Sequence, residues 1–243
     1  GDDEVSARLA ARHETVTYGR CDGVDVRAVD VRPVRGAFTF EVHRHGGQLG
    51  TIQLPMRGIH NVVNATGAIA MALELGVGFD DIAAALARFG GVARRFDVRG
   101  IDRGATFVDD YAHLPSEISA VLAATRHSGE AWRRVIAVFQ PNRYNRIAEI
   151  WQEYGTAFAD ADIVVLTDIY ASGTTPIPGV TGKLIVNAVT EADPTKRVVW
   201  LPRRDALVDV VAREARDGDI VVSMGCGDIA TLPSEVLDAR GNA

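Results

Sequence analysis

Cysteine, aromatic residues and net positive charge are all scarce in this sequence of 243 residues. Cys21 and Cys226 lie far apart and outside any CxxC or Cys/His spacing, so we expect neither a disulfide framework nor a metal site. The net charge of −6 argues against a nucleic acid partner, although local basic clusters can still bind small anions. Neither a membrane-spanning apolar run nor a signal peptide is evident. We therefore predict a cytoplasmic protein with small-molecule ligands and no membrane partner.

Glycine-rich phosphate-binding motifs are missing as well. The loops "SMGCGDI" and "GTTPIPGVTGK" follow apolar runs, but neither has the GxxxxGK[ST] spacing of a P-loop or the GxGxxG of a dinucleotide fold. The sequence therefore contains no recognisable cradle for a triphosphate. The same absence argues against a Rossmann-type oxidoreductase, whose glycine fingerprint follows an early strand.

The first third of the chain alternates apolar and polar residues. The runs "ETVTYGR", "VDVRAVDVRPV", "AFTFEVHRHGG" and "LGTIQLP" indicate half-exposed strands of an antiparallel sheet. We predict one helix before them and two after them, over residues 5–11, 60–78 and 80–89. Gly90 and Gly91 then mark a domain boundary, which divides the chain into residues 1–91 and 92–243.

The remainder of the chain has the pattern of an α/β domain. The runs "RVIAVFQP", "ADIVVLTDIY", "KRVVWLP" and "GDIVVSMGCG" are typical of strands buried on both faces. We expect helices between and after them, over residues 116–126, 144–159, 182–192, 205–216 and 228–237. This alternation predicts a Rossmann-like, mostly parallel, doubly wound sheet. Ligands of such sheets bind beyond the carboxyl ends of the strands.

Two stretches at predicted strand ends carry charged side chains. In "FQPNRYNR", Arg143 and Arg146 lie three residues apart at a helix start, where their guanidiniums could grip a carboxylate or phosphate. In "VDDYAHLPSE", a carboxylate could accept from ribose hydroxyls, and His113 could orient a substrate or move a proton. The alternatives are a basic, solvent-exposed helix start and a polar turn before a helix that Ser116 caps.

Two further clusters precede these stretches. In "RGIHNVVNATG", His60, Asn61 and Asn64 share one side of a helix start, and asparagine amides match the edge of an adenine. A helix cap at Asn61 is the simpler interpretation. In "GGVARRFD", Arg94 and Arg95 follow the predicted hinge, where they could contact a phosphate on domain closure or be exposed linker charges.

Together, and in this order, these stretches resemble the Mur ligase family. The resemblance rests on "GIHNVVNATGAIAMALELG", "FGGVARRFDVRG", "VDDYAHLPSEI", "VFQPNRYNR", "LTDIYASGTTPIPGV" and "SMGCGDI". It is strongest with the branch that adds the first amino acid of the peptidoglycan stem peptide. It implies that residues 1–91 end a central ATP-binding ligase domain and that residues 92–243 form the family's C-terminal domain. The chain would then be a fragment, inactive alone, with the P-loop, the UDP-substrate domain and the magnesium ligands upstream.

The resemblance also implies a reaction and a role for each candidate residue. ATP, with Mg²⁺, would phosphorylate the carboxylate of UDP-N-acetylmuramate, and the amine of L-alanine would displace the phosphate in a closed, dry site. His60, Asn61 and Asn64 would line the adenine pocket, Asp110 would accept from the ribose, and Arg94 and Arg95 would approach ribose or phosphate. Tyr111, His113, Arg143 and Arg146 would position alanine and the acyl phosphate, and Arg95, His113, Arg143 and Arg146 would be catalytic.

The sequence departs from the family pattern at four positions. The family often has histidine where Leu114 and Asn142 stand, serine where Asn145 stands and glutamate where Thr174 stands. Because two imidazoles are lost, the reaction class is better defined than the amino acid. A sister ligase that attaches a recycled tripeptide to the same nucleotide sugar is one alternative, and a non-catalytic nucleotide-binding module is another.

Overall fold

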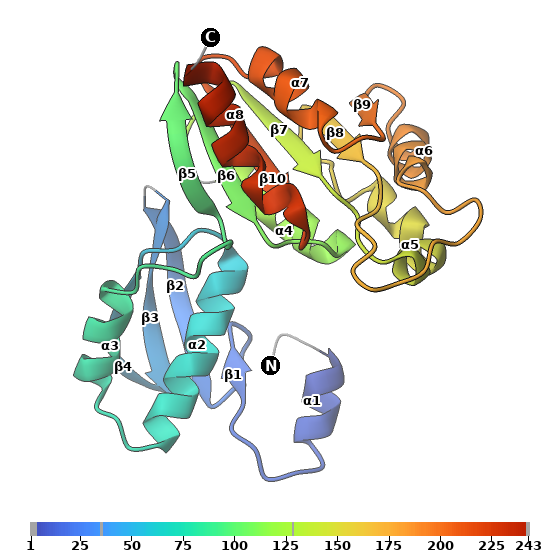
Figure 1. Ribbon diagram of the computed structural model, residues 1–243. Helices are drawn as coiled ribbons and strands as arrows, with labels where there is room; N and C mark the ends of the chain where they lie inside the picture. The colour runs from blue at the N-terminus through green and yellow to red at the C-terminus, as the bar shows by residue number, and fades with distance from the viewer. Residues whose placement is uncertain (1–3, 35, 128, 242–243) are drawn as a thin grey trace. The chain divides into compact units, whose positions relative to one another are not determined.

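A computed structural model describes residues 4–34, 36–127 and 129–241 of the chain. The chain divides into two compact units, residues 1–91 with 127–130 and residues 92–126 with 131–243. Each unit has its own sheet and its own hydrophobic core (Figure 1). The assignment of the two units to particular ligase domains stays a prediction.

The first unit is a four-stranded sheet with two helices packed on it. Its elements are α1 (Glu4–Ala10), β1 (Tyr18–Gly19), β2 (Val26–Val34), β3 (Ala37–Arg44), β4 (Gly47–Leu54), α2 (Ile59–Glu74) and α3 (Phe79–Ala87). Alternate strand residues such as Phe40, Val42 and Ile52 are buried against Val62 and Ile69 of α2. This period of two is what the alternating sequence predicted for β2, β3 and β4.

The prediction of a first antiparallel strand over residues 14–20 was wrong. Only Tyr18 and Gly19 form a strand, and it pairs parallel with β2. The preceding segment is held by a side chain instead of a ladder, because the Asp25 carboxylate accepts hydrogen bonds from the backbone N–H and the hydroxyl of Thr17, at 2.8 and 2.7 Å. A local side-chain acceptor of this kind competes with strand pairing.

The second unit is a six-stranded sheet with helices on both faces (Figure 1). Its strands are β5 (Asp97–Asp102), β6 (Ala105–Asp110), β7 (Arg134–Phe139), β8 (Ile163–Thr167), β9 (Arg197–Leu201) and β10 (Asp219–Met224). Its helices are α4 (Pro115–Arg126), α5 (Tyr144–Ile150), α6 (Lys183–Ala192), α7 (Ala206–Glu214) and α8 (Leu232–Gly241). The strand order is β5-β6-β10-β7-β8-β9, and all neighbours pair parallel except β5 with β6. The predicted mostly parallel, doubly wound sheet is confirmed.

Two details of the second unit differ from the prediction. β5 was not predicted: its apolar residues Val98 and Ile101 are exposed, and its pairing with β6 shifts register between Val98 and Gly100. The predicted helix over residues 144–159 ends at Ile150 and continues as a 3-10 helix, Trp151–Gly155. A side chain at Gly155 would lie 2.9 Å from the carbonyl oxygen of Ala188, so the glycine lets this segment approach α6 closely.

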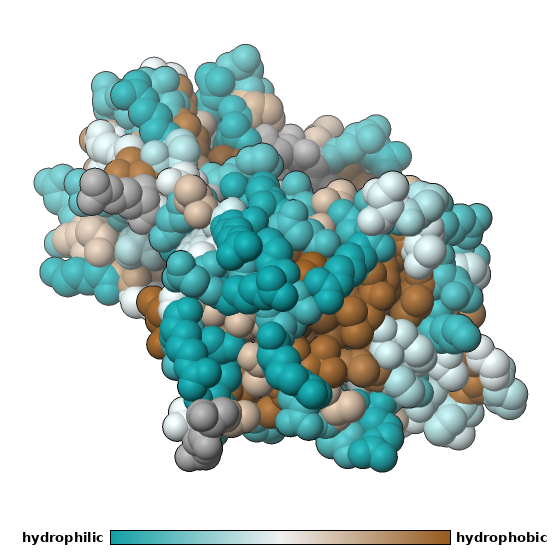
Figure 2. Space-filling view, turned by 90° about the horizontal axis from the view of Figure 1, so that it is seen from above, coloured by the Kyte–Doolittle hydropathy of each residue, from teal (hydrophilic) through white to brown (hydrophobic). Residues whose placement is uncertain are grey.

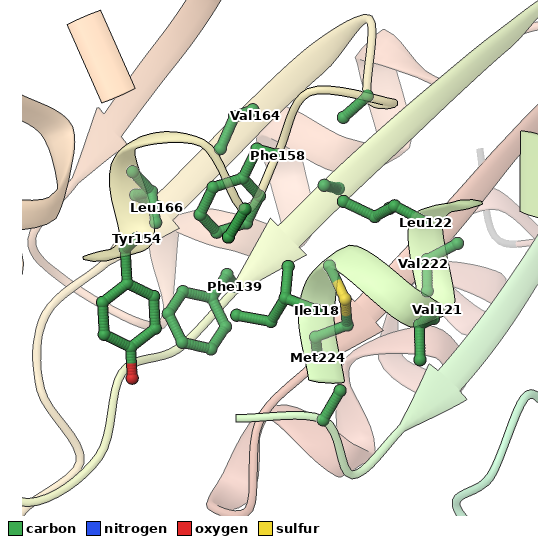
Figure 3. Packing of buried hydrophobic residues seen from close by; sticks show 14 of the residues in the cluster. Ile118, Val121, Leu122, Phe139, Tyr154, Phe158, Val164, Leu166, Val222 and Met224 are labelled. Atoms are coloured by element: carbon green, nitrogen blue, oxygen red, sulfur yellow. The ribbon is translucent and has the colours of Figure 1, made fainter. Parts of the chain in front are cut away.

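Two hydrophobic clusters fill the space above and below the parallel sheet. On the face covered by α4, α5 and α6, Phe139 lies 5.6 Å from Tyr154 and 5.7 Å from Phe158, measured between ring centroids (Figure 3). On the other face, α7 and α8 cover a cluster that includes Ile136 and Val165. Strands buried on both faces hold their carboxyl ends rigidly, which is what a binding site at that edge requires.

The surface is mixed in character. Figure 2 shows hydrophobic residues, in brown, reaching the surface in one broad area among hydrophilic ones. None of the helices in the described part of the chain combines the length and the hydrophobicity needed to cross a bilayer.

Candidate functional site

The candidate site lies at the carboxyl edge of the second unit's sheet, where β6, β10 and β7 end side by side. The backbone N–H of Gly225, just after β10, donates to the carbonyl of Asp110 at 3.2 Å, and the N–H of Gln140 donates to Met224 at 3.1 Å. The helices after β6 and β7 cover one face of the sheet, whereas the helix after β10 covers the other. The chain therefore diverges to opposite faces at β10, and a crevice at such a switch point is where ligands of open α/β sheets bind.

Asp110 anchors the turn that follows β6. Its carboxylate is 2% exposed, and its two oxygens accept hydrogen bonds from the backbone N–H groups of Phe96 and Ala112, at 2.8 and 2.7 Å. Burial raises the pKa of this carboxyl, while these two N–H groups and the nearby Arg95 oppose the shift. The structure thus gives Asp110 a positional role, and the predicted ribose contact stays a prediction.

Arg94 is tied to two strand ends. Its Nε donates to the Asp109 carboxylate at 2.9 Å, and its Nη2 donates to the carbonyl of Gly225 at 2.7 Å. Asp109 is fully buried, and its second oxygen has no partner among the described residues. Burial raises the pKa of Asp109, and the Arg94 guanidinium opposes that shift. Arg94 and Phe96 both have positive φ angles, 60° and 49°, so the backbone bends sharply on either side of Arg95.

The predicted residues Arg95, Tyr111 and His113 come together beside this bend. The guanidiniums of Arg94 and Arg95 lie 5.0 and 5.7 Å from the centre of the Tyr111 ring, within cation–π range. The His113 ring meets the Tyr111 ring edge-on at 5.3 Å, and its Nδ1 lies 3.0 Å from the Tyr111 carbonyl oxygen. Because a carbonyl can only accept, Nδ1 carries the hydrogen, which leaves Nε2 as the ring nitrogen available to a substrate.

The two arginines after β7 differ in their surroundings. Arg146 Nη1 donates to the side-chain oxygen of Asn142 at 2.8 Å, and Asn142 is 2% exposed. Arg143 is exposed and has a positive φ of 65°, and its backbone N–H donates to the carbonyl of Tyr170 at 3.0 Å. No hydrogen bond from the Arg143 side chain is found within the described residues. Such a strained backbone at a non-glycine residue costs about 1–3 kcal/mol and often marks a functional position.

Tyr154 connects the β6 turn to the β7 arginines. Its ring is fully buried, and its hydroxyl donates to the carbonyl of His113 at 2.8 Å. Burial raises the pKa of Tyr154, and Arg146 is close enough to oppose that shift. The turn that contains His113 leads into α4, and α4 and α5 pack on the same hydrophobic cluster as Tyr154. Sequence reasoning did not identify Tyr154, because nothing in "WQEYGTAF" separates this tyrosine from ordinary core residues.

Gln140 is a second residue that the sequence analysis did not assign. It is 4% exposed; its Nε2 donates to Asp228 at 2.7 Å and its Oε1 accepts from the backbone N–H of Ile229 at 3.3 Å. It joins the loop after β7 to the loop after β10. A polar residue directly after an apolar run was the available signal.

His60, Asn61 and Asn64 lie on the first turns of α2, in the other unit. Asn64 is exposed, and the other two are half-buried. The interpretation of Asn61 as a helix cap was wrong: α2 is preceded by Gly58, and the Asn61 amide donates to the carbonyl of Arg57 at 2.7 Å. A cap would instead accept from an N–H of the first turn.

Comparison with known proteins identifies the family. Residues 94–227, more than half of the chain, match the family described as Mur ligase, glutamate ligase domain. The chain is 44% identical over 214 residues, 88% of its length, to a UDP-N-acetylmuramate–L-alanine ligase of Pelobacter propionicus, and this match covers 46% of that protein. The chain spans about half the length of the curated relatives it matches.

Two solved structures extend this result. The UDP-N-acetylmuramate-alanine ligase MurC of Thermotoga maritima matches with a TM-score of 0.81 at 25% identity, over 99% of this chain and 50% of that one. The MurF ligase of the same organism, in complex with ADP, matches with a TM-score of 0.68 at 20% identity, over 99% of this chain and 52% of that one, which is a likeness of fold. Because the family match spans more than half of the chain, including the strand ends that form the candidate site, the chain belongs to the Mur ligase family.

Proposed function

We propose that this chain supplies the C-terminal part of an ATP-dependent ligase that joins L-alanine to UDP-N-acetylmuramate in the synthesis of a peptidoglycan precursor. The cluster of Arg95, Tyr111 and His113 beyond β6, at the sheet edge where β7 also ends shortly before Arg146, carries this proposal. The 44% identity to an L-alanine-adding relative supports it. In this reaction ATP converts the sugar carboxylate to an acyl phosphate, the alanine nitrogen bonds to its carbonyl carbon, and phosphate leaves with the electrons of the broken bond.

The chain's own residues fit only part of the nucleotide. Arg95 is exposed beside the buried Asp110, which supports a contact from Arg95 to ribose or phosphate. Asp110 already holds two backbone N–H groups and is 2% exposed, so its own ribose contact requires the loop to open. The exposed Asn64 supports the adenine contact predicted for α2. The missing triphosphate cradle we assign to the part of the longer protein that this chain does not span.

Magnesium is the second predicted cofactor. The described residues contain no group of three histidine, cysteine or carboxylate side chains that could hold a metal ion. Mg²⁺ is often held by one or two carboxylates together with water and substrate phosphates, and we propose that its protein ligands come mainly from the rest of the protein.

The residues around β6 and β7 fit the amide-forming half of the reaction. His113 Nε2 is available to accept a proton from the alanine ammonium, because Nδ1 is held by the Tyr111 carbonyl. Arg146, fixed by Asn142, offers a positive charge to the alanine carboxylate or the acyl phosphate. The exposed Arg143 adds a second charge at the same loop.

The test is product formation by the full-length protein. We expect ADP release that requires both UDP-N-acetylmuramate and L-alanine, with the amide detected by mass spectrometry. Faster turnover with a stem tripeptide than with L-alanine would favour the tripeptide-recycling ligase. If the full-length protein binds ATP in calorimetry but forms no amide with either substrate, the ligase proposal fails and a nucleotide-binding module replaces it. Titration of ATP and L-alanine into this chain alone measures how much of each site the chain contains.

A further inference from the structure

We propose that Arg94 and Asp109 form a positioning pair that sets the orientation of Tyr111 and His113, and that Arg94 is not itself a nucleotide contact. The inference deepens the proposed function, on which its kinetic part rests. It concerns two residues that would otherwise be read as a hinge charge and a strand end.

Arg94 contacts three neighbouring strands of the sheet. Its guanidinium bonds to Asp109 on β6 and to the Gly225 carbonyl after β10, at 2.9 and 2.7 Å. Its backbone carbonyl accepts from the N–H of Tyr111 at 2.7 Å, and its backbone N–H approaches Asp97 of β5 at 3.4 Å. One residue thus holds three neighbouring strands and the first residue of the functional turn. Two of the five guanidinium N–H groups are thereby bonded to protein acceptors, which fixes the direction of the side chain and reduces its capacity to bind a phosphate.

Asp109 is a buried carboxylate that depends on Arg94. This carboxylate is 0% exposed, and Arg94 is its sole hydrogen-bond donor among the described residues. A buried carboxylate is stable only if a positive group compensates for its lost hydration. Separating the pair would leave the Asp109 carboxylate buried without a positive partner, which is unfavourable. The Arg94 side chain is therefore held at the edge of the sheet.

Arg94 is linked to the His113 imidazole through Tyr111. The Arg94 guanidinium lies 5.0 Å from the centre of the Tyr111 ring, and the Tyr111 ring meets the His113 ring edge-on. The Tyr111 carbonyl lies 3.0 Å from His113 Nδ1 and the Glu117 carboxylate lies 3.4 Å from it, so both favour the tautomer with the hydrogen on Nδ1. If the hydrogen bond from the Tyr111 N–H to the Arg94 carbonyl weakens, the Tyr111 and His113 rings lose their fixed orientations. At metal sites, mutation of the groups that orient the ligating side chains typically lowers affinity or activity by about 10- to 100-fold, and we expect an effect of this order here.

The kinetic test uses the full-length protein with Arg94→Met, Arg94→Lys and Asp109→Asn. We expect Arg94→Met to raise the KM for the amino acid about tenfold while the KM for ATP stays within about twofold. Arg94→Lys keeps the charge, but a single ammonium lacks the planar guanidinium that bonds to both Asp109 and the Gly225 carbonyl. We therefore expect the KM for the amino acid to lie between those of Arg94→Met and the parent. Arg99→Met is the matched control, because Arg99 lies on β5, pairs with Asp97 and Ser234 within the described part of the chain, and acts on Asp109 through its charge without a hydrogen bond. An equal rise in the KM for ATP would overturn the proposal in favour of direct nucleotide contact.

A second measurement does not depend on ligase activity. In this chain labelled at histidine and tyrosine, the ring resonances of His113 and Tyr111, assigned with His113→Gln and Tyr111→Phe, should shift in Arg94→Met and Asp109→Asn but not in Arg99→Met. Unchanged ring resonances in a folded Arg94→Met protein would refute the positioning pair whatever the full-length protein catalyses. Shifted resonances in a protein without ligase activity would keep the pair and reject the proposed function. If Arg94→Met does not fold, Arg94→Lys and Asp109→Asn decide by the same criterion.

Discussion

Replacement of Tyr154 by phenylalanine tests the link between the core and the site. The variant keeps the ring that packs against Phe139 and removes only the hydroxyl that donates to the His113 carbonyl. The loss of one partly buried hydrogen bond destabilises a protein by about 1–2 kcal/mol. Removal of the whole ring, as in Tyr154→Ala, costs about 3–5 kcal/mol because a cavity is added. The two variants therefore separate the polar contribution from the packing contribution.

The pH dependence gives this prediction a sign. Burial raises the pKa of Tyr154 above its ordinary value of 10.0, so the folded unit keeps the phenol proton at a pH where the unfolded chain has released it. The unfolded state then binds fewer protons, and the stability contributed by the tyrosine falls as the pH rises above 10.0. Phenylalanine has no such proton. The stability difference between the two proteins should narrow between pH 8 and about pH 11.

Tryptophan fluorescence is a suitable assay, because Trp132, Trp151 and Trp200 all lie in the second unit. Urea titration at pH 8 should show Tyr154→Phe to be about 1–2 kcal/mol less stable. Tyr144→Phe is the matched control, because this half-buried tyrosine makes no hydrogen bond through its hydroxyl to the described part of the chain. Equal losses in the two variants, or a loss at Tyr154 that is the same at pH 8 and pH 11, would refute the reasoning.

Three further predictions concern the same unit. Asn142→Ala removes the acceptor that fixes Arg146, and we expect the KM for the amino acid in the full-length protein to rise about tenfold. Glu214→Gln should cost about 1–2 kcal/mol at pH 7. Arg197, the main cause, lowers the pKa of Glu214, so its contribution is present above pH 4.5 and lost as the pH falls through the folded value. The difference between Glu214→Gln and the parent should therefore shrink in urea titrations at low pH. Gly227→Ala would place a methyl group 2.5 Å from a glutamine side-chain oxygen and 2.6 Å from a tyrosine ring, and we expect a loss of about 1–3 kcal/mol in the same fluorescence assay.

The parallel strands were predictable because strands buried on both faces are nearly continuous apolar runs in the sequence. β7, β8 and β10 are nearly unbroken apolar runs, and every residue of β8 and β10 is buried. β5 has no such run, since it lies at the edge of the sheet, contains a glycine and has no buried residue. Its position is set by pairing with β6 and by contact with α8, neither of which is visible locally. Edge strands are therefore where a pattern of buried residues fails as a guide.

The site divides in the same way. The charged residues at the strand ends were predictable, because parallel strands bring their carboxyl ends to one edge. Their partners were not. The sequence shows Arg94 and Asp109 15 residues apart, and His113 and Tyr154 41 residues apart, with nothing to indicate that either pair is in contact. Which carboxylate is satisfied by backbone N–H groups and which by an arginine depends on the bend at Arg94, and only the structure shows that bend.

The departures from the family pattern take on definite structural roles in this chain. Asn142 accepts the hydrogen bond from Arg146, and Thr174 accepts one at 3.0 Å from the N–H of Tyr144, at the start of α5. An amide and a hydroxyl can each accept these bonds without carrying charge, so neither places a negative charge at this edge of the sheet. An imidazole at position 142 would add a titratable group beside Arg146, and burial together with that positive charge would lower its pKa below the ordinary histidine value of about 6.5. We therefore expect Asn142→His to give the full-length protein a pH dependence of the amino acid KM below about pH 6.5 that the parent lacks. Parallel KM profiles for the two proteins across that range would show that position 142 does not face the amino acid.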